Sequence, residues 1–236
     1  MSEHKDREED AQAAMLQPMA TYYELLQHTH DLLEPDLYLE IGVHEGHSLA
    51  FVDPATRTVG VDPEPKVDHA NDNTTVVAAT SDEFFANPAI LDVLGAPIDF
   101  AFIDGLHHFD QTLRDFINVE RFMAPDGVVY IHDCFPIDEV TAERDRTTLL
   151  WSGDVWKTIV ALRRHRPDLA VHTCTVAPTG MGVITGLDPT NRVLDTGFDA
   201  IVEEMNDVPF SDLEADRAAM LGTISSDWTE IQRFLR

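Results

Sequence analysis

Short apolar runs alternate with amphipathic segments along most of the chain. The runs at residues 37–41, 57–61, 74–79, 98–103, 128–132, 169–175 and 180–185 have the length and composition of buried β-strands. Between several of them apolar residues recur at helical spacing, most clearly over residues 109–123 and 155–164. Strands that alternate with helices indicate an α/β fold, in which helices cover both faces of a parallel sheet.

The two ends of the chain have a different pattern. Residues 1–12 are polar, and apolar positions over residues 13–33 predict one or two amphipathic helices broken near Pro18. The tail beyond residue 188 predicts further helices. We therefore expect an N-terminal helical segment over residues 1–36, a central domain over 37–187 and a C-terminal helical tail over 188–236. The apolar faces of the terminal helices could cover a pocket or form a dimer interface, so both a monomer and a homo-oligomer are consistent with the sequence.

Charge narrows the range of partners. The chain has 43 acidic and 16 basic residues, a net charge of −27, which excludes a general nucleic-acid binder and disfavours binding to anionic membranes. No apolar run is long enough to span a membrane, and the charged N-terminus does not resemble a signal peptide. The only cysteines, Cys134 and Cys174, form no disulfide or zinc pattern. These features predict a cytoplasmic protein that acts on a small molecule.

A glycine-rich loop follows the first predicted strand. Gly42 and Gly46 lie in the segment E-I-G-V-H-E-G-H-S, residues 40–48, and Asp62 ends the next strand. Glycines let a ligand approach the backbone closely, and a carboxylate at that distance can accept hydrogen bonds from ribose hydroxyls. The segment therefore predicts a nucleotide site, although a tight turn followed by a surface aspartate would leave the same pattern.

Acidic residues and histidines also follow two later strands. Asp104 comes directly after the strand at 98–103, and His132 and Asp133 end the strand at 128–132. Because adjacent strand ends lie about 5 Å apart, these side chains can converge on one divalent cation such as Mg²⁺, and the histidine would also admit Mn²⁺. The alternative is that the two aspartates only cap loops or helices.

Together these motifs resemble class I S-adenosylmethionine-dependent methyltransferases. The resemblance covers residues 37–187 and rests on E-I-G-V-x-x-G-x-S, G-V-D, S-D-E-F-F, F-I-D-G-x-H and P-x-G-V-x-x-x-H-D. More narrowly, it points to the branch with macrolide-sugar O-methyltransferases and cephalosporin-hydroxylase-like proteins. It implies a Rossmann-like, seven-stranded, mostly parallel sheet whose last strand is antiparallel.

The resemblance also implies roles for individual residues. The cofactor-binding residues would be Glu40, Gly42, Val43, His44, Gly46, Ser48, Asp62, Ser81, Asp82 and Asp104. Metal-dependent relatives hold Mg²⁺ at the positions of Asp104, His132 and Asp133, but the middle position is an acid there. His107 matches the general base of the sugar O-methyltransferases, with His108 as a competing candidate.

We therefore expect methyl transfer from S-adenosylmethionine to a hydroxyl group of a small molecule, such as a sugar or a natural product. A metal-bound hydroxyl loses its proton more readily, and an imidazole can accept that proton at neutral pH. Two alternatives stay open: a metal-independent O- or N-methyltransferase on the same fold, and a cofactor-binding protein without catalysis. A nicotinamide-dependent oxidoreductase is disfavoured, because His44 occupies the second glycine of G-x-G-x-x-G.

Two local features have competing interpretations. Trp151, Asp154 and Trp156 could bind an acceptor, or Trp156 could belong to the core while Asp154 caps a helix. Ser81 is expected to begin a helix, but Phe84 stands where a capping box from Ser81 would need an acid.

Overall fold

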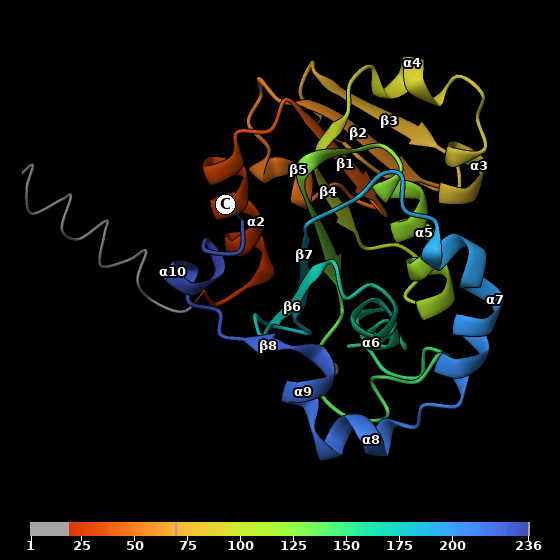
Figure 1. Cartoon of the computed structure of the whole chain (residues 1–236). Helices are drawn as coiled ribbons and strands as arrows, with labels where there is room; N and C mark the ends of the chain where they lie inside the picture. The colour runs from red at the N-terminus through yellow and green to blue at the C-terminus, as the bar shows by residue number, and fades with distance from the viewer. Residues whose placement is uncertain (1–18, 69, 236) are drawn as a thin grey trace, which may run out of the picture.

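The described residues fold around one eight-stranded sheet. The computed structural model describes residues 19–68 and 70–235, so the part of the first predicted helix at residues 13–18 lies outside the described residues. The strands are β1 (Leu37–Ile41), β2 (Arg57–Asp62), β3 (Thr74–Ala78), β4 (Ile98–Ile103), β5 (Met123–His132), β6 (Ala170–Cys174), β7 (Met181–Thr185) and β8 (Thr223–Ile224) (Figure 1).

The strand order is β3-β2-β1-β4-β5-β7-β6-β8. Strands β1 to β5 are parallel, whereas β7 runs antiparallel to both β5 and β6. This confirms the predicted Rossmann-like, mostly parallel sheet with its antiparallel strand. The sheet has one strand more than predicted, because the two residues of β8 pair with β6. The strand order reverses between β1 and β4, which is where open α/β sheets bind ligands.

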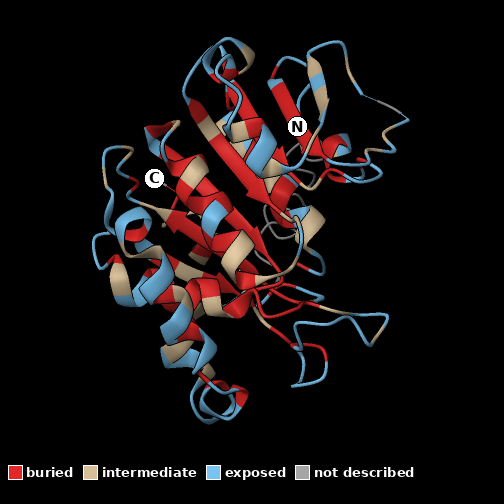
Figure 2. Cartoon of the chain, turned by 90° about the vertical axis from the view of Figure 1, so that its right-hand side faces the viewer, coloured by how far each residue is buried: buried red, intermediate tan, exposed pale blue. Residues whose placement is uncertain are grey.

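Helices cover both faces of the sheet, as predicted. One face carries α3 (Ser81–Phe85), α4 (Ile90–Leu94), α5 (Phe109–Glu120), α6 (Trp156–His165), α7 (Val193–Asn206), α8 (Phe210–Ala215) and α9 (Arg217–Leu221). The other face carries α2 (Tyr22–Leu33), the 3-10 helix η1 (Ser48–Phe51) and α10 (Trp228–Ile231). Alternate side chains of β1 enter the two cores, Leu39 on the first face and Tyr38 on the second. Figure 2 shows the strands buried between outer helix faces that remain exposed.

Three local predictions need correction. The N-cap of α3 is Thr80, one residue before Ser81, and the capping box is complete: the Glu83 amide donates to Thr80 Oγ1 (3.2 Å) and the Thr80 amide to Glu83 Oε2 (2.9 Å). The helix predicted over residues 109–123 ends at Glu120. The strand predicted over residues 128–132 begins earlier, at Met123, and its pairing with β4 shifts register.

None of the helices described is both long and apolar enough to cross a membrane.

Candidate functional site

The glycine loop joins the ends of three strands. Gly42 has φ +91°, and a side chain there would overlap the carbonyl oxygen of Asp104. Only glycine therefore lets the end of β1 lie this close to the end of β4. His44 also adopts a left-handed backbone, with φ +46°, and its amide donates to Asp62 Oδ2 at 2.8 Å.

Asp62 is held in place by backbone groups. Its second oxygen, Oδ1, accepts from the Glu64 amide at 2.8 Å. The side chain is almost fully buried and lines the larger of two cavities. A fixed carboxylate of this kind suits a pair of ribose hydroxyls.

All ten predicted cofactor-binding residues line one or both of two neighbouring cavities. The larger, about 620 Å³, is lined by residues that include Gly42, His44, Asp62, Ser81, Asp82 and Asp104. The smaller, about 120 Å³, is lined by residues that include Glu40, Gly42, Val43, His44, Gly46, Ser48 and Asp104. The cavities share three lining residues, and the larger has the size of a site for a drug-sized ligand. The structure thus brings together residues from four separate motifs.

Glu40 lies at the inner wall of the smaller cavity. It accepts hydrogen bonds from Tyr38 Oη (2.8 Å) and from Ser48 Oγ. Burial raises the pKa of Glu40 to about 8, although both hydrogen bonds oppose that shift. Burial thus favours the neutral acid, and the two hydrogen bonds join Glu40 to Tyr38 and to Ser48 beside the glycine loop.

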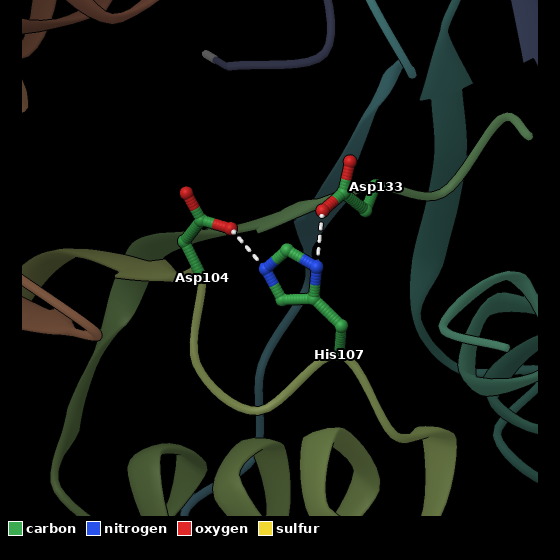
Figure 3. Close-up of side chains that lie close together, drawn as sticks. All are labelled: Asp104, His107 and Asp133. Atoms are coloured by element: carbon green, nitrogen blue, oxygen red, sulfur yellow. Dashed lines mark ion pairs between the residues drawn. The ribbon is translucent and has the colours of Figure 1, made fainter. Parts of the chain in front are cut away.

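A cluster of aspartates and histidines lies at the ends of β4 and β5. His107 lies between two carboxylates, with Nε2 3.3 Å from Asp104 Oδ1 and Nδ1 2.9 Å from Asp133 Oδ2 (Figure 3). His132 Nδ1 is 3.2 Å from Asp104 Oδ1 and 3.6 Å from Asp133 Oδ2. Asp133 also accepts a hydrogen bond from Thr179 Oγ1. The three predicted metal ligands and the predicted base therefore form one cluster.

The charges of the cluster stabilise one another. Burial opposes ionisation of Asp104, but the His132 and His107 imidazoles outweigh it and hold the pKa of that carboxyl well below its usual range. Burial likewise lowers the pKa of His107, but hydrogen bonds to Asp104 and Asp133 raise it to about 10. The same two carboxylates raise the pKa of His132. Without a bound cation, both histidines are therefore stabilised in their protonated forms.

The residues of the cluster fit a divalent cation. Asp104, His107 and Asp133 each offer a ligand atom, and these atoms lie within 4.8 Å of one another. Two carboxylates and an imidazole are a ligand set that suits Mn²⁺ and similar ions. The same set could bind Mg²⁺ if water molecules filled the remaining coordination positions. His132 lies close enough to join them through Nδ1.

The loop between β5 and α6 contacts His107, the candidate general base. The Trp151 ring stacks on His107, with ring centroids 5.1 Å apart. Asp154 does cap a helix, but the capped helix is α5: Asp154 Oδ1 accepts from the Phe109 amide at 2.8 Å. Trp156 is buried in the core, and His108 precedes α5 outside the cluster.

Sequence reasoning missed several residues that line these cavities. Gln111, Asp115 and Arg146 line the larger cavity, and Tyr22 lines the smaller one, where its ring lies 4.2 Å from that of His132. Gln111 and Asp115 are four residues apart on the helix after F-I-D-G-x-H, a spacing that places them on one face. Tyr22 carries no comparable signal, because α2 is distant from the motifs in sequence.

Comparison with known proteins supports the resemblance. A family model described as a methyltransferase domain matches residues 39–134. The comparison with curated protein sequences gives no match.

Several solved methyltransferases share the fold. The O-methyltransferase TomG from Streptomyces achromogenes, solved with SAM, has a TM-score of 0.55 at 17% identity over 73% of this chain and 82% of its own. A Bacillus cereus O-methyltransferase with SAH has a TM-score of 0.53 at 16% identity over 77% and 87%. The SAH-bound Podospora anserina methyltransferase PaMTH1 has a TM-score of 0.52 at 18% identity over 71% and 78%.

The matched segment runs from β1 through the end of β5 and contains the glycine loop, Asp62, Asp104, His107 and Asp133. Residues 39–134 thus match a methyltransferase domain, and the chain shares the fold of these solved methyltransferases.

Proposed function

We propose that this protein transfers the methyl group of S-adenosylmethionine to a hydroxyl oxygen of a small molecule, such as a sugar or a polyol-bearing natural product. The observation that carries the proposal is the position of His107. It lies between Asp104 and Asp133, and both His107 and Asp104 line the larger cavity, which six of the ten predicted cofactor-binding residues line.

In this proposal the chain positions two reactants for an in-line displacement. The glycine loop and Asp62 would hold the cofactor in the cavities beside the ends of β4 and β5, where proximity and orientation favour transfer. Asp104, Asp133 and His132 would hold Mg²⁺ or Mn²⁺, which lowers the pKa of a coordinated hydroxyl. His107 accepts the hydroxyl proton as the oxygen attacks, and such a base contributes roughly 10²- to 10⁴-fold to the rate.

The test begins with calorimetry. S-adenosylmethionine is titrated into the protein with Mg²⁺, with Mn²⁺ and with EDTA, and binding is expected to weaken in Asp62→Ala. Tritiated cofactor then reports transfer to a panel of sugars, polyols and catechols. His107→Gln should bind the cofactor normally and lose at least a hundredfold in kcat, while His108→Gln on the neighbouring residue serves as the control. If the wild type binds no S-adenosylmethionine under any condition, the proposal is wrong.

A metal-independent methyltransferase is the second candidate. It is favoured by the contacts of His107, whose two ring nitrogens already meet carboxylates within 3.3 Å. Transfer that continues unchanged in EDTA, together with no calorimetric signal from Mn²⁺, would select this candidate. A requirement for the cation, weakened by Asp133→Asn, would select the metal-dependent one.

A further inference from the structure

The turn between β6 and β7, residues 175–180, lies against the segment that follows β5. Thr179 is completely buried in this turn, and its hydroxyl donates a hydrogen bond to Asp133 Oδ1. The carbonyl oxygen of the same residue accepts from the Phe135 amide at 2.6 Å. A side chain added at Gly180 would overlap the Phe135 side chain. Thr179 therefore bonds to the segment at two points, and neither contact has a role in the mechanism above.

The backbone of Asp133 is left-handed, with φ +62°. This conformation is uncommon for residues other than glycine, although aspartate adopts it more readily than most. It persists where the surrounding structure determines it. The two hydrogen bonds of Thr179, one with the Asp133 side chain and one with the Phe135 amide, lie on either side of Cys134. They therefore hold the chain at the point where it leaves β5.

The same hydroxyl restricts the orientation of the Asp133 carboxylate. Oδ1 accepts from Thr179, whereas Oδ2 lies 2.9 Å from His107 Nδ1 and 3.6 Å from His132 Nδ1. Because a carboxylate is planar, a donor held on one oxygen limits the directions that the other can take. Thr179 has a single hydroxyl proton, so donating it to Asp133 leaves none for another acceptor. The two oxygens of Asp133 therefore have separate partners: Thr179 on one side and the histidines on the other.

We propose that Thr179 is a positioning residue for methyl transfer, because its hydroxyl holds Asp133 Oδ2 beside His107 and keeps that oxygen available to a divalent cation. The proposal rests on the proposed function, in which Asp133 and His107 act on the acceptor hydroxyl. Groups that orient metal ligands through hydrogen bonds typically contribute about 10- to 100-fold to metal affinity or activity. Thr179 lies outside the motifs of the sequence, 46 residues after Asp133.

Three variants separate the hydroxyl from its surroundings. Thr179→Val removes the hydroxyl but keeps a branched side chain of similar size, whereas Thr179→Ser keeps the hydroxyl. Thr173→Val is the matched control, because Thr173 on β6 is equally buried and its hydroxyl has no hydrogen-bond partner among the residues that the structure describes. Urea denaturation establishes that each variant folds, and Thr179→Ala replaces Thr179→Val if that variant does not.

The first measurement needs neither cofactor nor metal. The ¹H–¹⁵N spectrum of the histidine rings reports on the surroundings of His107, whose signals are assigned by their absence from His107→Gln. We expect Thr179→Val to shift these signals, Thr179→Ser to restore most of the wild-type position and Thr173→Val to leave them in place. Unchanged His107 signals in Thr179→Val, or a shift just as large in Thr179→Ser, would overturn the proposal.

The second measurement concerns the reaction. Calorimetry gives the Kd of Mn²⁺ and of S-adenosylmethionine, and steady-state kinetics give kcat and KM for the acceptor found by the tritium assay. Thr179→Val should lower kcat and weaken Mn²⁺ binding by about tenfold or more, with the Kd of S-adenosylmethionine unchanged, and Thr179→Ser should recover most of both losses. If the wild type binds no Mn²⁺, kcat alone decides.

The two proposals can fail separately. A wild type that transfers no methyl group contradicts the proposed function, and the positioning role in transfer fails with it even where the His107 signals respond to Thr179→Val. Transfer by the wild type that Thr179→Val leaves unchanged, or that Thr173→Val lowers as much, overturns the role of Thr179 alone.

Discussion

The indole of Trp151 lies nearly parallel to the imidazole of His107, with 5.1 Å between ring centroids and 21° between ring planes. Two further contacts come from the same loop. The Trp151 carbonyl is 3.4 Å from His107 Nδ1, and a side chain at Gly153, which has φ +57°, would overlap the His107 carbonyl oxygen. The loop after β5 therefore restricts both the ring and the backbone of His107.

This contact predicts that Trp151 is a positioning residue. Trp151→Ala should lower kcat about three- to tenfold, because an aromatic pair contributes roughly 0.5–1.5 kcal/mol. Trp151→Phe keeps a ring on His107 and should recover most of the rate. Steady-state kinetics on the acceptor found by the tritium assay separates kcat from KM. A raised acceptor KM with unchanged kcat would instead mean that Trp151 contacts the acceptor.

Gly42 is the position of the loop where substitution should be least tolerated. Gly42→Ala forces an alanine into φ +91° and against the backbone of Asp104, a strain of about 1–3 kcal/mol before any displacement. Because Asp104 would have to move, we expect S-adenosylhomocysteine binding to weaken by more than tenfold in calorimetry. Gly46→Ala is the comparison, because Gly46 also has positive φ, +78°, but an added methyl group there would meet the side chains of Val67 and Leu49 and no backbone atom among its nearest neighbours. If the two variants lose equal affinity for S-adenosylhomocysteine, backbone strain alone, without displacement of Asp104, explains the effect.

The sequence predicted which acidic side chains lie together better than it predicted the helix caps and short strands around them. Asp104 and Asp133 could be placed together because both end apolar strands, and parallel strands bring their carboxyl ends to one edge. The Thr80 cap was misplaced by one residue, since residues 80 and 81 can both cap and only the Glu83 contact distinguishes them. β8 could not be predicted, because two residues carry no periodicity.

Contacts between distant segments could not be predicted from the sequence either. The contact of the Tyr22 ring with the His132 ring joins α2 to β5, and the contact of Trp151 with His107 joins two loops 44 residues apart. Hydrophobic periodicity reports which face of an element is buried, but not which element covers it. The roles of His107 and His132 came from resemblance to a family, whereas their shared contacts with the two aspartates came from the structure.

His30 should make the protein less stable in acid. Both ring nitrogens are buried without a hydrogen-bond partner in the described structure, and burial lowers the pKa of His30 to about 4. Between pH 6.5 and 4 the unfolded chain binds the proton more tightly than the folded one, so stability falls as pH falls through this window. The loss amounts to roughly 2–3 kcal/mol at its acid end.

His30→Phe removes this penalty while keeping a ring against Tyr38 and Phe100, which the imidazole contacts edge-on. The measurement is urea denaturation at pH 7.5 and pH 4.5 for wild type, His30→Phe and the half-buried neighbour variant His28→Asn. We expect the free energy of unfolding of His30→Phe to fall less between the two pH values. Carboxyl groups elsewhere titrate alike in all three proteins and cancel in the comparison. An equal fall in the free energy of unfolding of the wild type and of His30→Phe between the two pH values would contradict this role of His30.

Arg166 and Glu120 form a buried ion pair on the side of the sheet that carries α5 and α6. Arg166 Nη1 and Nη2 lie 2.7 and 2.9 Å from the two Glu120 oxygens, and both side chains are at most 5% exposed. Glu120 Oε1 also accepts from the Asp188 amide at 3.1 Å, so the pair links the ends of both helices to the start of the C-terminal tail.

The stability losses from replacing the two partners should not be additive. Arg166→Met leaves the Glu120 carboxylate buried without its cation, which costs about 3–5 kcal/mol of unfolding free energy. Glu120→Leu leaves the guanidinium with Asp168, whose side chain is 46% exposed, and should cost less. In the double variant no buried charge remains unpaired, so its loss should be smaller than the sum of the two single losses by at least 1 kcal/mol. Urea denaturation of the four proteins completes the cycle, and strictly additive losses would show that the pair does not couple the two helix ends.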